Sequence, residues 1–434
     1  MLLEKAIPVS QERAMLVGVE RSGQSSWDLA DSLRELEQLV KSAGGKVYHK
    51  AIQKLPAPTA PYYIGKGKAE ELAKISQNLE LSTVVFDDEL SPAQGRNLEK
   101  MFARKVLDRT QLILDIFAQR AKTREGKLQI ELAQLKYLLP RLTRMWTHLS
   151  RQSGGIGTRG PGETQLEVDR RRVQEKIAKL LKELEEVRRH RSIQRHGRQR
   201  HEWPMIALVG YTNAGKSTLL NRLTRSDVFA ADQLFATLDP TTRKTVLPNK
   251  QTLLLSDTVG FLQKLPTHLI ESFKATLEEV KEADILLHVI DLSHPLYENQ
   301  IKAVHDVLAQ LGCAEKEMIF VFNKVDRLEN SGLAERCLSQ HANSVAISAA
   351  TGEGIDQLFQ EIVSRLRSKK QEVTFRIPQE EASLISEIYR GGQVLGTSYR
   401  GNFMIVKAVV SETVVGRLKA YLKKEPKSKK PKAA

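Results

Sequence analysis

Cysteine is scarce in this chain of 434 residues, which contains only Cys313 and Cys337. Two cysteines exclude a disulfide framework and are typical of proteins of the reducing cytosol, so we expect a cytoplasmic location. Long apolar runs are missing too: no stretch approaches the ~18 residues of a membrane span. We therefore expect no transmembrane segment, although peripheral contact with a membrane is compatible with the sequence. Residues 1–5 lack the layout of a signal peptide.

Acidic residues are in the minority, since 52 Asp and Glu stand against 67 Lys and Arg, a net charge of +15. Residues 118–202 hold 21 basic and 10 acidic side chains, a net +11, and residues 419–434 carry a net +6. The remaining residues of the chain carry a net charge of −2. A basic helix can be merely a solvated face, but this concentration favours an RNA partner bound in a salt-sensitive way.

A phosphate-binding pattern, G-x-x-x-x-G-K-S, begins at Gly210. It follows an apolar run over residues 205–209, which predicts a buried strand, and precedes a helical pattern over residues 218–223. The loop thus ends at a helix N-terminus, where free N–H groups and the helix dipole favour anions. The predicted phosphate-binding residues are Gly210, Tyr211, Thr212, Asn213, Ala214, Gly215, Lys216 and Ser217.

Three further motifs each follow a predicted strand. Asp257 can hold Mg²⁺ through water, and Gly260, three residues later, can turn its N–H to a γ-phosphate. Asp326 ends an N-K-x-D motif and can accept hydrogen bonds from two guanine donors that adenine lacks. A loop at residues 348–350 can give a backbone N–H to the guanine oxygen. Taken singly, these motifs are usually turns or polar loops. In this order they resemble the translation-factor class of GTPases, which implies GTP and GDP as ligands.

By that resemblance residues 235–243 form switch I, and Thr237 joins Ser217 as a ligand of Mg²⁺; Thr241 and Thr242 remain alternatives to Thr237. The predicted catalytic residues are Lys216, Thr237, Asp257 and Gly260. The other predicted nucleotide contacts are Phe235, Ala236, Leu238, Asp239, Thr258, Val259, Asn323, Lys324, Val325, Asp326, Ser348, Ala349 and Ala350.

Longer segments resemble the HflX family of ribosome-associated GTPases. The resemblance rests on the GTPase motifs just described and on residues 61–68, 108–117 and 154–165, and it extends over residues 10–365. Members of the family bind the large ribosomal subunit, and they have also been associated with ATP hydrolysis. The motif Gly65-Lys66-Gly67-Lys68 is accordingly either a second, ATP-binding site or a structural turn.

Two residues bear on the mechanism. Many GTPases place Gln after D-x-x-G to orient the attacking water, but Phe261 stands there and cannot do so. We therefore expect slow intrinsic hydrolysis that rises when a partner completes the site. Asn213 either binds K⁺ near the transferring phosphate, as in some GTPases with Asn at this position, or merely stabilises the loop.

The basic segment predicts an antiparallel helical hairpin. Apolar residues recur at spacings of 3 and 4 from Leu128 to Leu149 and again from Val173 to Val187, so each series marks one stripe of a helix. Pro140 should kink or break the first helix. Between the helices, the glycine-rich tip Gly154–Gly162 is either a flexible turn or a functional loop. The family resemblance implies that it reaches the peptidyl-transferase region of the large subunit.

The fold class expected is α/β and multidomain: a P-loop GTPase domain with a mostly parallel sheet lies between an α/β N-terminal domain with its hairpin and a small α+β domain. In the N-terminal domain, residues 14–19 and 83–86 predict strands and residues 29–43 a helix. Near the C-terminus, residues 373–377 and 402–410 predict strands, residues 391–392 a turn and residues 414–422 a helix. The predicted units are residues 1–117, 118–202, 203–370 and 371–422, with a disordered basic tail at 423–434.

Two hypotheses for function result, both for a protein expected to be a monomer. In the first, a GTPase docks on the large ribosomal subunit, splits or rescues stalled ribosomes, and is stimulated by the ribosome. In the second, a GTP-gated module binds RNA or aids ribosome assembly without splitting. A signalling GTPase that acts on proteins fits the +11 hairpin poorly.

Overall fold

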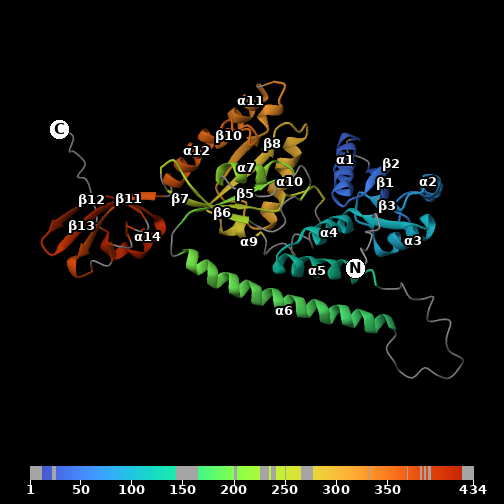
Figure 1. Ribbon diagram of the computed structural model, residues 1–434, viewed down its shortest axis with the longest axis horizontal. Coiled ribbons are helices and arrows are strands. Elements are labelled where there is room, and N and C mark those ends of the chain that lie inside the picture. Colours follow the sequence, from blue (N-terminus) through green and yellow to red (C-terminus); the bar gives the residue numbers. More distant parts are fainter. Residues whose placement is uncertain are drawn as a thin grey trace, which may run out of the picture.

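The computed structural model describes residues 12–21, 26–142, 165–199, 203–224, 234–235, 241–249, 251–264, 277–330, 332–368, 370–381, 384–385, 388–389 and 392–422. These residues form three separate sheets of four, six and three strands. Figure 1 shows the six-stranded sheet in the middle of the molecule, the four-stranded sheet at one end and the three-stranded sheet at the other. The predicted tip loop, residues 236–239 of switch I and the basic tail lie outside the described residues.

The N-terminal sheet is parallel throughout, with the strand order β2-β1-β3-β4. Its strands are β1 (Arg13–Arg21), β2 (Lys46–Leu55), β3 (Thr83–Phe86) and β4 (Lys105–Asp108), and its helices are α1 (Ser26–Ser42), α2 (Lys66–Asn78), α3 (Pro92–Phe102) and α4 (Arg109–Arg120). Side chains alternate between the faces of a strand. Leu16 of β1 packs with α1 and α4, whereas Met15 and Val17 pack with α2 and α3. Helices therefore cover both faces, as a buried parallel sheet requires.

Local sequence signals set the starts of these helices. Ser91 and Gln94 form a capping box at α3, and Pro92 occupies its first turn. Asp108 caps α4 by accepting from the N–H of Gln111 at 2.9 Å. Gly65 precedes α2, and its N–H donates to the side chain of Gln53. The G-x-G-K motif thus spans the N-terminus of α2, and ATP binding there stays a prediction.

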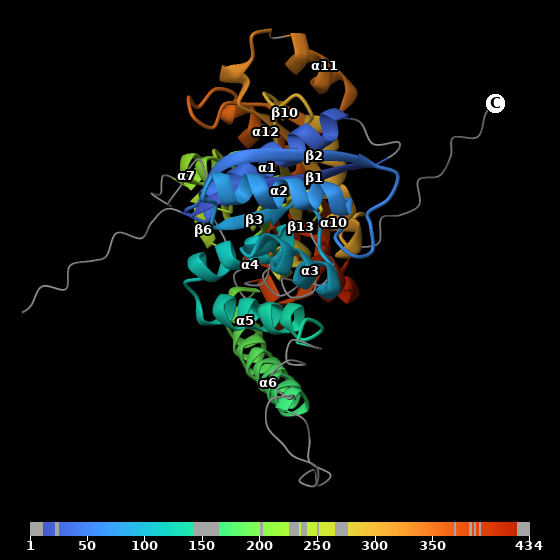
Figure 2. The ribbon, with the colours of Figure 1, turned by 90° about the vertical axis from the view of Figure 1, so that its right-hand side faces the viewer.

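The helices α5 (Arg124–Leu138) and α6 (Gln165–Gln199) form the predicted antiparallel pair. Ion pairs run in opposite sequence directions, from Arg124 to Glu183 and from Glu131 to Lys176. The buried seam consists of Leu128, Leu132, Leu180 and Leu184, with Leu135, Ile177 and Val187 packed beside it. The helix α5 ends two residues before Pro140, so the expected break is confirmed. The rest of the first stripe, from residue 143 on, lies outside the described residues. Figure 2 shows α4, α5 and α6 in succession away from the N-terminal sheet.

The central sheet has the order β10-β9-β8-β5-β7-β6, and only β6 is antiparallel to its neighbour. Its strands are β5 (Met205–Gly210), β6 (Thr241–Val246), β7 (Thr252–Asp257), β8 (Ile285–Asp291), β9 (Met318–Asn323) and β10 (Ser344–Ala346). Its helices are α7 (Lys216–Thr224), α9 (Glu278–Glu282), α10 (Tyr297–Gln310), α11 (Gly332–Gln340) and α12 (Ile355–Ser368), with a short 3-10 turn η1 (Val325–Arg327). The mostly parallel sheet predicted for this part is confirmed.

The C-terminal sheet is antiparallel, with the order β11-β13-β12. Its elements are β11 (Lys370–Pro378), η2 (Gln379–Glu381), β12 (Gly392–Arg400), β13 (Phe403–Ser411), α14 (Glu412–Arg417) and η3 (Lys419–Tyr421). The sequence did not predict β12, and it placed a turn where Gly392 begins this strand. Residues 395–400 are all exposed, so they give no alternation of apolar and polar side chains. The expected helix over 414–422 is shorter and continues as the turn η3.

One apolar core joins the N-terminal sheet to the central one. It contains side chains of α1 and α4 together with Tyr211, Phe235, Phe261 and Leu262. The ring of Phe117 in α4 meets that of Phe235 edge to face at 4.5 Å. The N-terminal domain is therefore packed directly on the residues around the predicted nucleotide site. Among the described helices, none is both long and apolar enough to cross a membrane.

Candidate functional site

Most of the predicted motifs gather at one edge of the central sheet. The strands β5, β7, β8, β9 and β10 are parallel, so their carboxyl ends lie on the same side. The phosphate-binding loop follows β5, Asp257 ends β7 and Asn323 ends β9. Ligands bind at this edge in open α/β sheets, where the loops after the strands converge.

Two glycines of the phosphate-binding loop are required by its geometry. Gly210 has φ +153°, and a Cβ there would lie 2.2 Å from the carbonyl oxygen of Val289. Gly215 has φ +95°, and a Cβ there would lie 2.2 Å from Nδ2 of Asn323. The loop can therefore pass close to the neighbouring strands only with glycine at these positions.

Lys216 begins α7 and folds back over the loop. Its side chain is buried, and Nζ donates to the carbonyl oxygens of Gly210 at 3.1 Å and Tyr211 at 2.7 Å. Burial lowers the pKa of Lys216 to about 8, although the nearby carboxylate of Asp257 acts in the opposite direction. With a pKa of about 8 the group is still mostly charged at neutral pH, and an anion bound in the loop would favour this form further, so the ammonium group is placed to bind phosphate.

Ser217, the next residue, lies against Asp257, so that two oxygen ligands come together. The Ser217 hydroxyl donates to Oδ2 of Asp257 at 2.7 Å. A hydroxyl and a carboxylate are hard oxygen donors of the kind that Mg²⁺ prefers, so the pair fits the predicted metal. Thr258 turns inward instead, and its hydroxyl donates to the carbonyl oxygen of Leu208. Gly260 lies against the loop, because a Cβ there would be 2.8 Å from Cα of Thr212.

Asn323 joins two of the predicted loops. It is 1 % exposed, its Nδ2 donates to the carbonyl of Ala214 at 2.8 Å, and its Oδ1 accepts from the N–H of Ala349 at 2.9 Å. On the far side, Arg222 donates to the carbonyls of Ala349 and Ala350. The N-K-x-D motif thus holds the 348–350 loop against the phosphate-binding loop.

The remaining residues of this motif follow the end of β9, and among them only Asp326 is exposed. Lys324 has a left-handed backbone, and its Nζ pairs with Asp291 at the end of β8, 2.6 Å away. Val325 and Asp326 lie in η1, and Asp326 is exposed. Ser348 is buried, and its hydroxyl accepts from the N–H of Thr351. An exposed carboxylate beside these loops is available to a base.

Phe235 of the predicted switch I and Phe261, which follows the D-x-x-G motif, both face the N-terminal domain. Phe235 packs on Phe117, and Phe261 is 2 % exposed within the same apolar core. Ala236, Thr237, Leu238 and Asp239 lie outside the described residues, so the choice among the three threonines stays open. Thr242 bonds to Ser256 within the sheet, and Thr241 is the strand partner of Asp257.

The N-terminal domain reaches the site through charged residues that sequence reasoning missed. Arg109 is 1 % exposed and pairs with Glu35 and with Asp87, the latter at 2.8 Å. The Tyr211 hydroxyl donates to Glu35 across the domain boundary. Burial raises the pKa of Glu35, although Arg109 and Tyr211 oppose it, and burial with Glu35 raises that of Tyr211. Two parts of this network had been singled out from the sequence, Arg109 within residues 108–117 and Tyr211 within the phosphate-binding loop, but not for this contact.

A cleft of about 510 Å³ follows this boundary. The helix α1 forms one wall with Asp31, Arg34 and Glu35, and the phosphate-binding loop forms the other with Tyr211, Thr212 and Asn213. His294, in the loop after β8, lies 3.5 Å from Asp31. The phosphate-binding loop and the loop after β8 are thus both in contact with the N-terminal domain.

The sheet order, the phosphate-binding loop after β5 and the Asn323 motif after β9 define a P-loop GTPase. Four family descriptions match in succession: "GTP-binding GTPase N-terminal" (residues 30–118), "GTP-binding GTPase Middle Region" (120–198), "50S ribosome-binding GTPase" (205–324) and "HflX C-terminal domain" (332–421). The chain belongs to the HflX family of GTPases, as its motifs predicted.

Curated relatives match over most of their length. "GTPase HflX" of Lacrimispora saccharolytica is 48% identical over 94% of this chain and 96% of its own. "GTPase HflX" of Escherichia coli (strain K12) is 48% identical over 83% of this chain and 85% of its own. A solved structure of a GTP-binding protein from Sulfolobus solfataricus in complex with GDP is 26% identical and covers 82% of this chain and 98% of its own, with a TM-score of 0.43.

Proposed function

We propose that this GTPase binds the large ribosomal subunit in the cytoplasm and splits or rescues stalled ribosomes, with GTP hydrolysis stimulated by the ribosome. The observation that carries the proposal is the basic hairpin beside a nucleotide site. Residues 170–172, 176, 179 and 182 of α6 are exposed arginines and lysines, while its apolar stripe is covered by α5. The family description matched by residues 205–324, a 50S ribosome-binding GTPase, supports the same partner.

In the site, we propose that Ser217 and Thr237 ligate Mg²⁺ and that Asp257 holds it through water. Mg²⁺ held by these residues would neutralise charge on the phosphates of the nucleotide. Lys216 binds the same oxygens, the N–H of Gly260 contacts the γ-phosphate, and Asp326 selects guanine. Asn213 is the candidate ligand of K⁺. The loop Gly210–Ser217 and the 348–350 loop complete the site.

We also propose that the chain is divided into units at residues 1–117, 118–202, 203–370 and 371–422. The protein would act as a monomer. The tip Gly154–Gly162 would act mechanically on the large subunit, while GTP orders switch I and hydrolysis releases it. A module without splitting activity would need only the basic faces of the hairpin, so the tip distinguishes the two functions.

The first experiment is sucrose-gradient sedimentation of intact 70S ribosomes with the protein and a non-hydrolysable GTP analogue. We expect free subunits with the full chain and intact particles when Gly154–Gly162 is shortened. Intact particles with both proteins would contradict splitting, and splitting by the shortened chain would contradict the role of the tip.

A second experiment tests the docking face. Replacing Lys179 and Lys182 by Gln should weaken binding to purified large subunits and lower the salt slope of log Kd by about one for each phosphate that is no longer neutralised. The matched control replaces Lys74 of α2 and Lys100 of α3, which are equally exposed but lie on the N-terminal domain. Equal weakening by both pairs would show a general effect of net charge and contradict docking through the hairpin.

A further inference from the structure

Arg34 lies on the face of α1 that lines the cleft beside the phosphate-binding loop. Two contacts hold α1 in place on either side of this residue. Asp31, three residues earlier, lies 3.5 Å from His294, and Glu35, the next residue, accepts a hydrogen bond from the Tyr211 hydroxyl. Residues three and four apart share one face of a helix, so Arg34 is held between the phosphate-binding loop and the loop after β8.

The Arg34 side chain has no partner in the part of the chain that the structure describes. It is exposed, and it makes no hydrogen bond or ion pair with a described residue. Each of the three carboxylates among the described lining residues already faces another basic group: Glu35 faces Arg109, Asp291 faces Lys324 and Asp31 faces His294. A guanidinium group stays charged at physiological pH, and its planar donors match the oxygens of a phosphate. The anion at hand for Arg34 is therefore a phosphate of the nucleotide.

The position that a γ-phosphate would take borders the same cleft. Thr212, which lines the cleft, is in contact with Gly260: a Cβ on this glycine would lie 2.8 Å from Cα of Thr212. The same Cβ would lie 3.1 Å from Nζ of Lys216. The two groups proposed to hold the γ-phosphate, Lys216 and the N–H of Gly260, thus meet beside Thr212. A side chain that crosses the cleft from α1 toward Thr212 approaches the oxygens of that phosphate.

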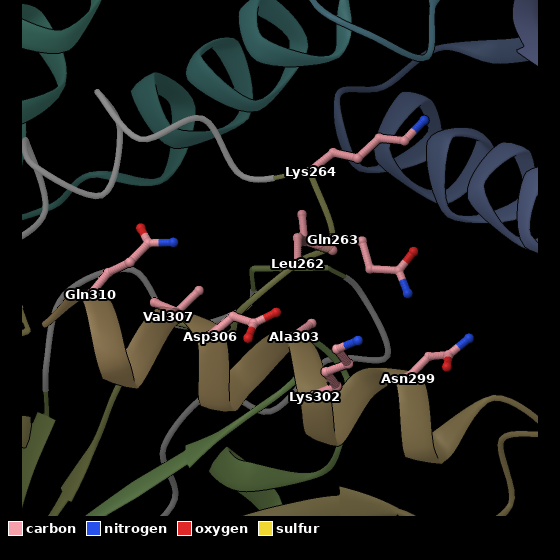
Figure 3. A pocket seen from close by; sticks show the side chains of 9 residues that line it. All are labelled: Leu262, Gln263, Lys264, Asn299, Lys302, Ala303, Asp306, Val307 and Gln310. Atoms are coloured by element: carbon pink, nitrogen blue, oxygen red, sulfur yellow. The ribbon is translucent and has the colours of Figure 1, made fainter. Parts of the chain in front are cut away.

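The groove between residues 262–264 and α10 offers no such position. It measures about 410 Å³, and none of its described lining residues belongs to the phosphate-binding loop (Figure 3). Of its two lysines, Lys302 stands on α10, on the far side of the groove. Figure 3 shows the other, Lys264, pointing toward the N-terminal domain, where it pairs with Asp87 and Asp88. The cleft, and not this groove, leads to the γ-phosphate.

The hydrolysis of GTP requires positive charge at this point. Water attacks the γ-phosphorus, the bond to the β–γ bridging oxygen breaks with its electron pair left on GDP, and the water gives up a proton to phosphate or solvent. Arginines of the same chain or of a partner stabilise the charge of this transition state in other GTPases. Phe261 is 2 % exposed in the core and brings no polar group to the site.

We propose that Arg34 is a catalytic residue supplied by the N-terminal domain, whose guanidinium group binds the γ-phosphate oxygens and stabilises the charge of the transition state. The inference rests on the proposed contact of Gly260 with the γ-phosphate, and it needs no ribosome. Arg34 supplies charge but does not orient the water. That task is left to the partner, so hydrolysis by the protein alone stays slow.

The first test measures single-turnover hydrolysis of GTP by the full chain alone. Arg34→Ala should lower the rate about thirtyfold, which is the difference between GTPases with and without an arginine of their own. The Kd of a non-hydrolysable GTP analogue should change by less than about threefold, because the group acts in the transition state. Arg34→Lys should recover little of the rate, since an ammonium group lacks the planar fork. The side chain is exposed, so neither change should harm folding.

Two arginines serve as matched comparisons. Arg104 is equally exposed and lies between α3 and β4, outside the cleft, whereas Arg327 follows Asp326 and lines the same cleft. Replacing either by Ala should leave the rate within about twofold of the wild type. A fall of less than tenfold in Arg34→Ala, or an equal fall in Arg104→Ala or Arg327→Ala, would overturn the proposal. The assay contains no ribosomes, so a failure of the proposed docking would leave its result unchanged.

Aluminium fluoride supplies a second readout that a merely structural role would not move. Together with GDP and Mg²⁺ it mimics the phosphoryl group of the transition state, so a site with its own arginine should bind GDP more tightly in its presence. We expect Arg34→Ala to lose this gain while its Kd for GDP alone stays unchanged, and Arg104→Ala to keep it. No gain in the wild type, or an undiminished gain in Arg34→Ala, would overturn the proposal.

Discussion

Replacing Asn323 by Ala should uncouple the phosphate-binding loop from the 348–350 loop. The side chain is 1 % exposed and makes two buried hydrogen bonds of 2.8 and 2.9 Å, to the Ala214 carbonyl and the Ala349 N–H. In the variant both backbone groups stay buried without these partners, at about 1–3 kcal/mol each. We expect the free energy of unfolding to fall by about 3 kcal/mol.

The nucleotide needs both loops in place, so part of this loss should appear in binding. A loss of about 2 kcal/mol corresponds to GDP binding about thirtyfold more weakly. Titration of a fluorescent GDP measures the affinity, and urea denaturation measures the stability. Asn323→Asp keeps the acceptor for Ala349 but places a buried carboxylate against the Ala214 carbonyl, so its affinity for GDP should fall at least as far as that of Asn323→Ala.

The control is Asn97→Ala in α3, which removes a hydrogen bond of 2.9 Å to the Pro61 carbonyl, remote from the nucleotide. It should leave GDP affinity unchanged. If Asn323→Ala bound GDP within twofold of the wild type, the two loops would not depend on this side chain, and the reasoning would be refuted.

Three further predictions concern pH, water and cations. Burial, with lesser effects of His305 and Lys216, lowers the pKa of His288 to about 3. In the unfolded chain the pKa of a histidine is about 6.5, so the free energy of unfolding should decline as the pH falls from about 6.5 toward 3, by about 3 kcal/mol at pH 4. Urea denaturation measures this decline, and His288→Phe should flatten it. Phe261→Gln should not accelerate hydrolysis, since the side chain faces the core, and it should destabilise the fold by about 3 kcal/mol; faster turnover would contradict this placement. If Asn213 binds K⁺, hydrolysis is faster in K⁺ than in Na⁺, and equal rates would leave it only a structural role.

The sequence predicted those parts of the site whose residues lie in short motifs directly after a strand. Each GTPase motif follows a strand, and parallel strands bring their carboxyl ends together, so the contact of Asn323 with Ala214 follows from the topology. The leucine spacing predicted the α5–α6 seam, because a heptad pattern is a local signal of helix pairing. Pro140 likewise predicted where α5 ends, because a proline acts on its own neighbours.

The contacts that join Glu35, Arg109 and Tyr211 could not be predicted in this way. Glu35 and Arg109 are 74 positions apart, and Tyr211 is 176 positions from Glu35, so no spacing relates them. Tyr211 stands within the phosphate-binding loop, yet its side chain faces the neighbouring domain. The exposed strand β12 was missed for a different reason, because its side chains lack the alternation that marks a half-buried strand.

The GTPase rate with and without purified large ribosomal subunits tests the central claim most directly. The account predicts slow hydrolysis by the protein alone and a rise of about a thousandfold or more with saturating subunits, since completing partners supply about 10³ to 10⁵ to GTPases. The Lys179 and Lys182 substitutions should shift the half-maximal subunit concentration upward without changing the rate in their absence. A rate that is the same with and without large subunits would contradict the account.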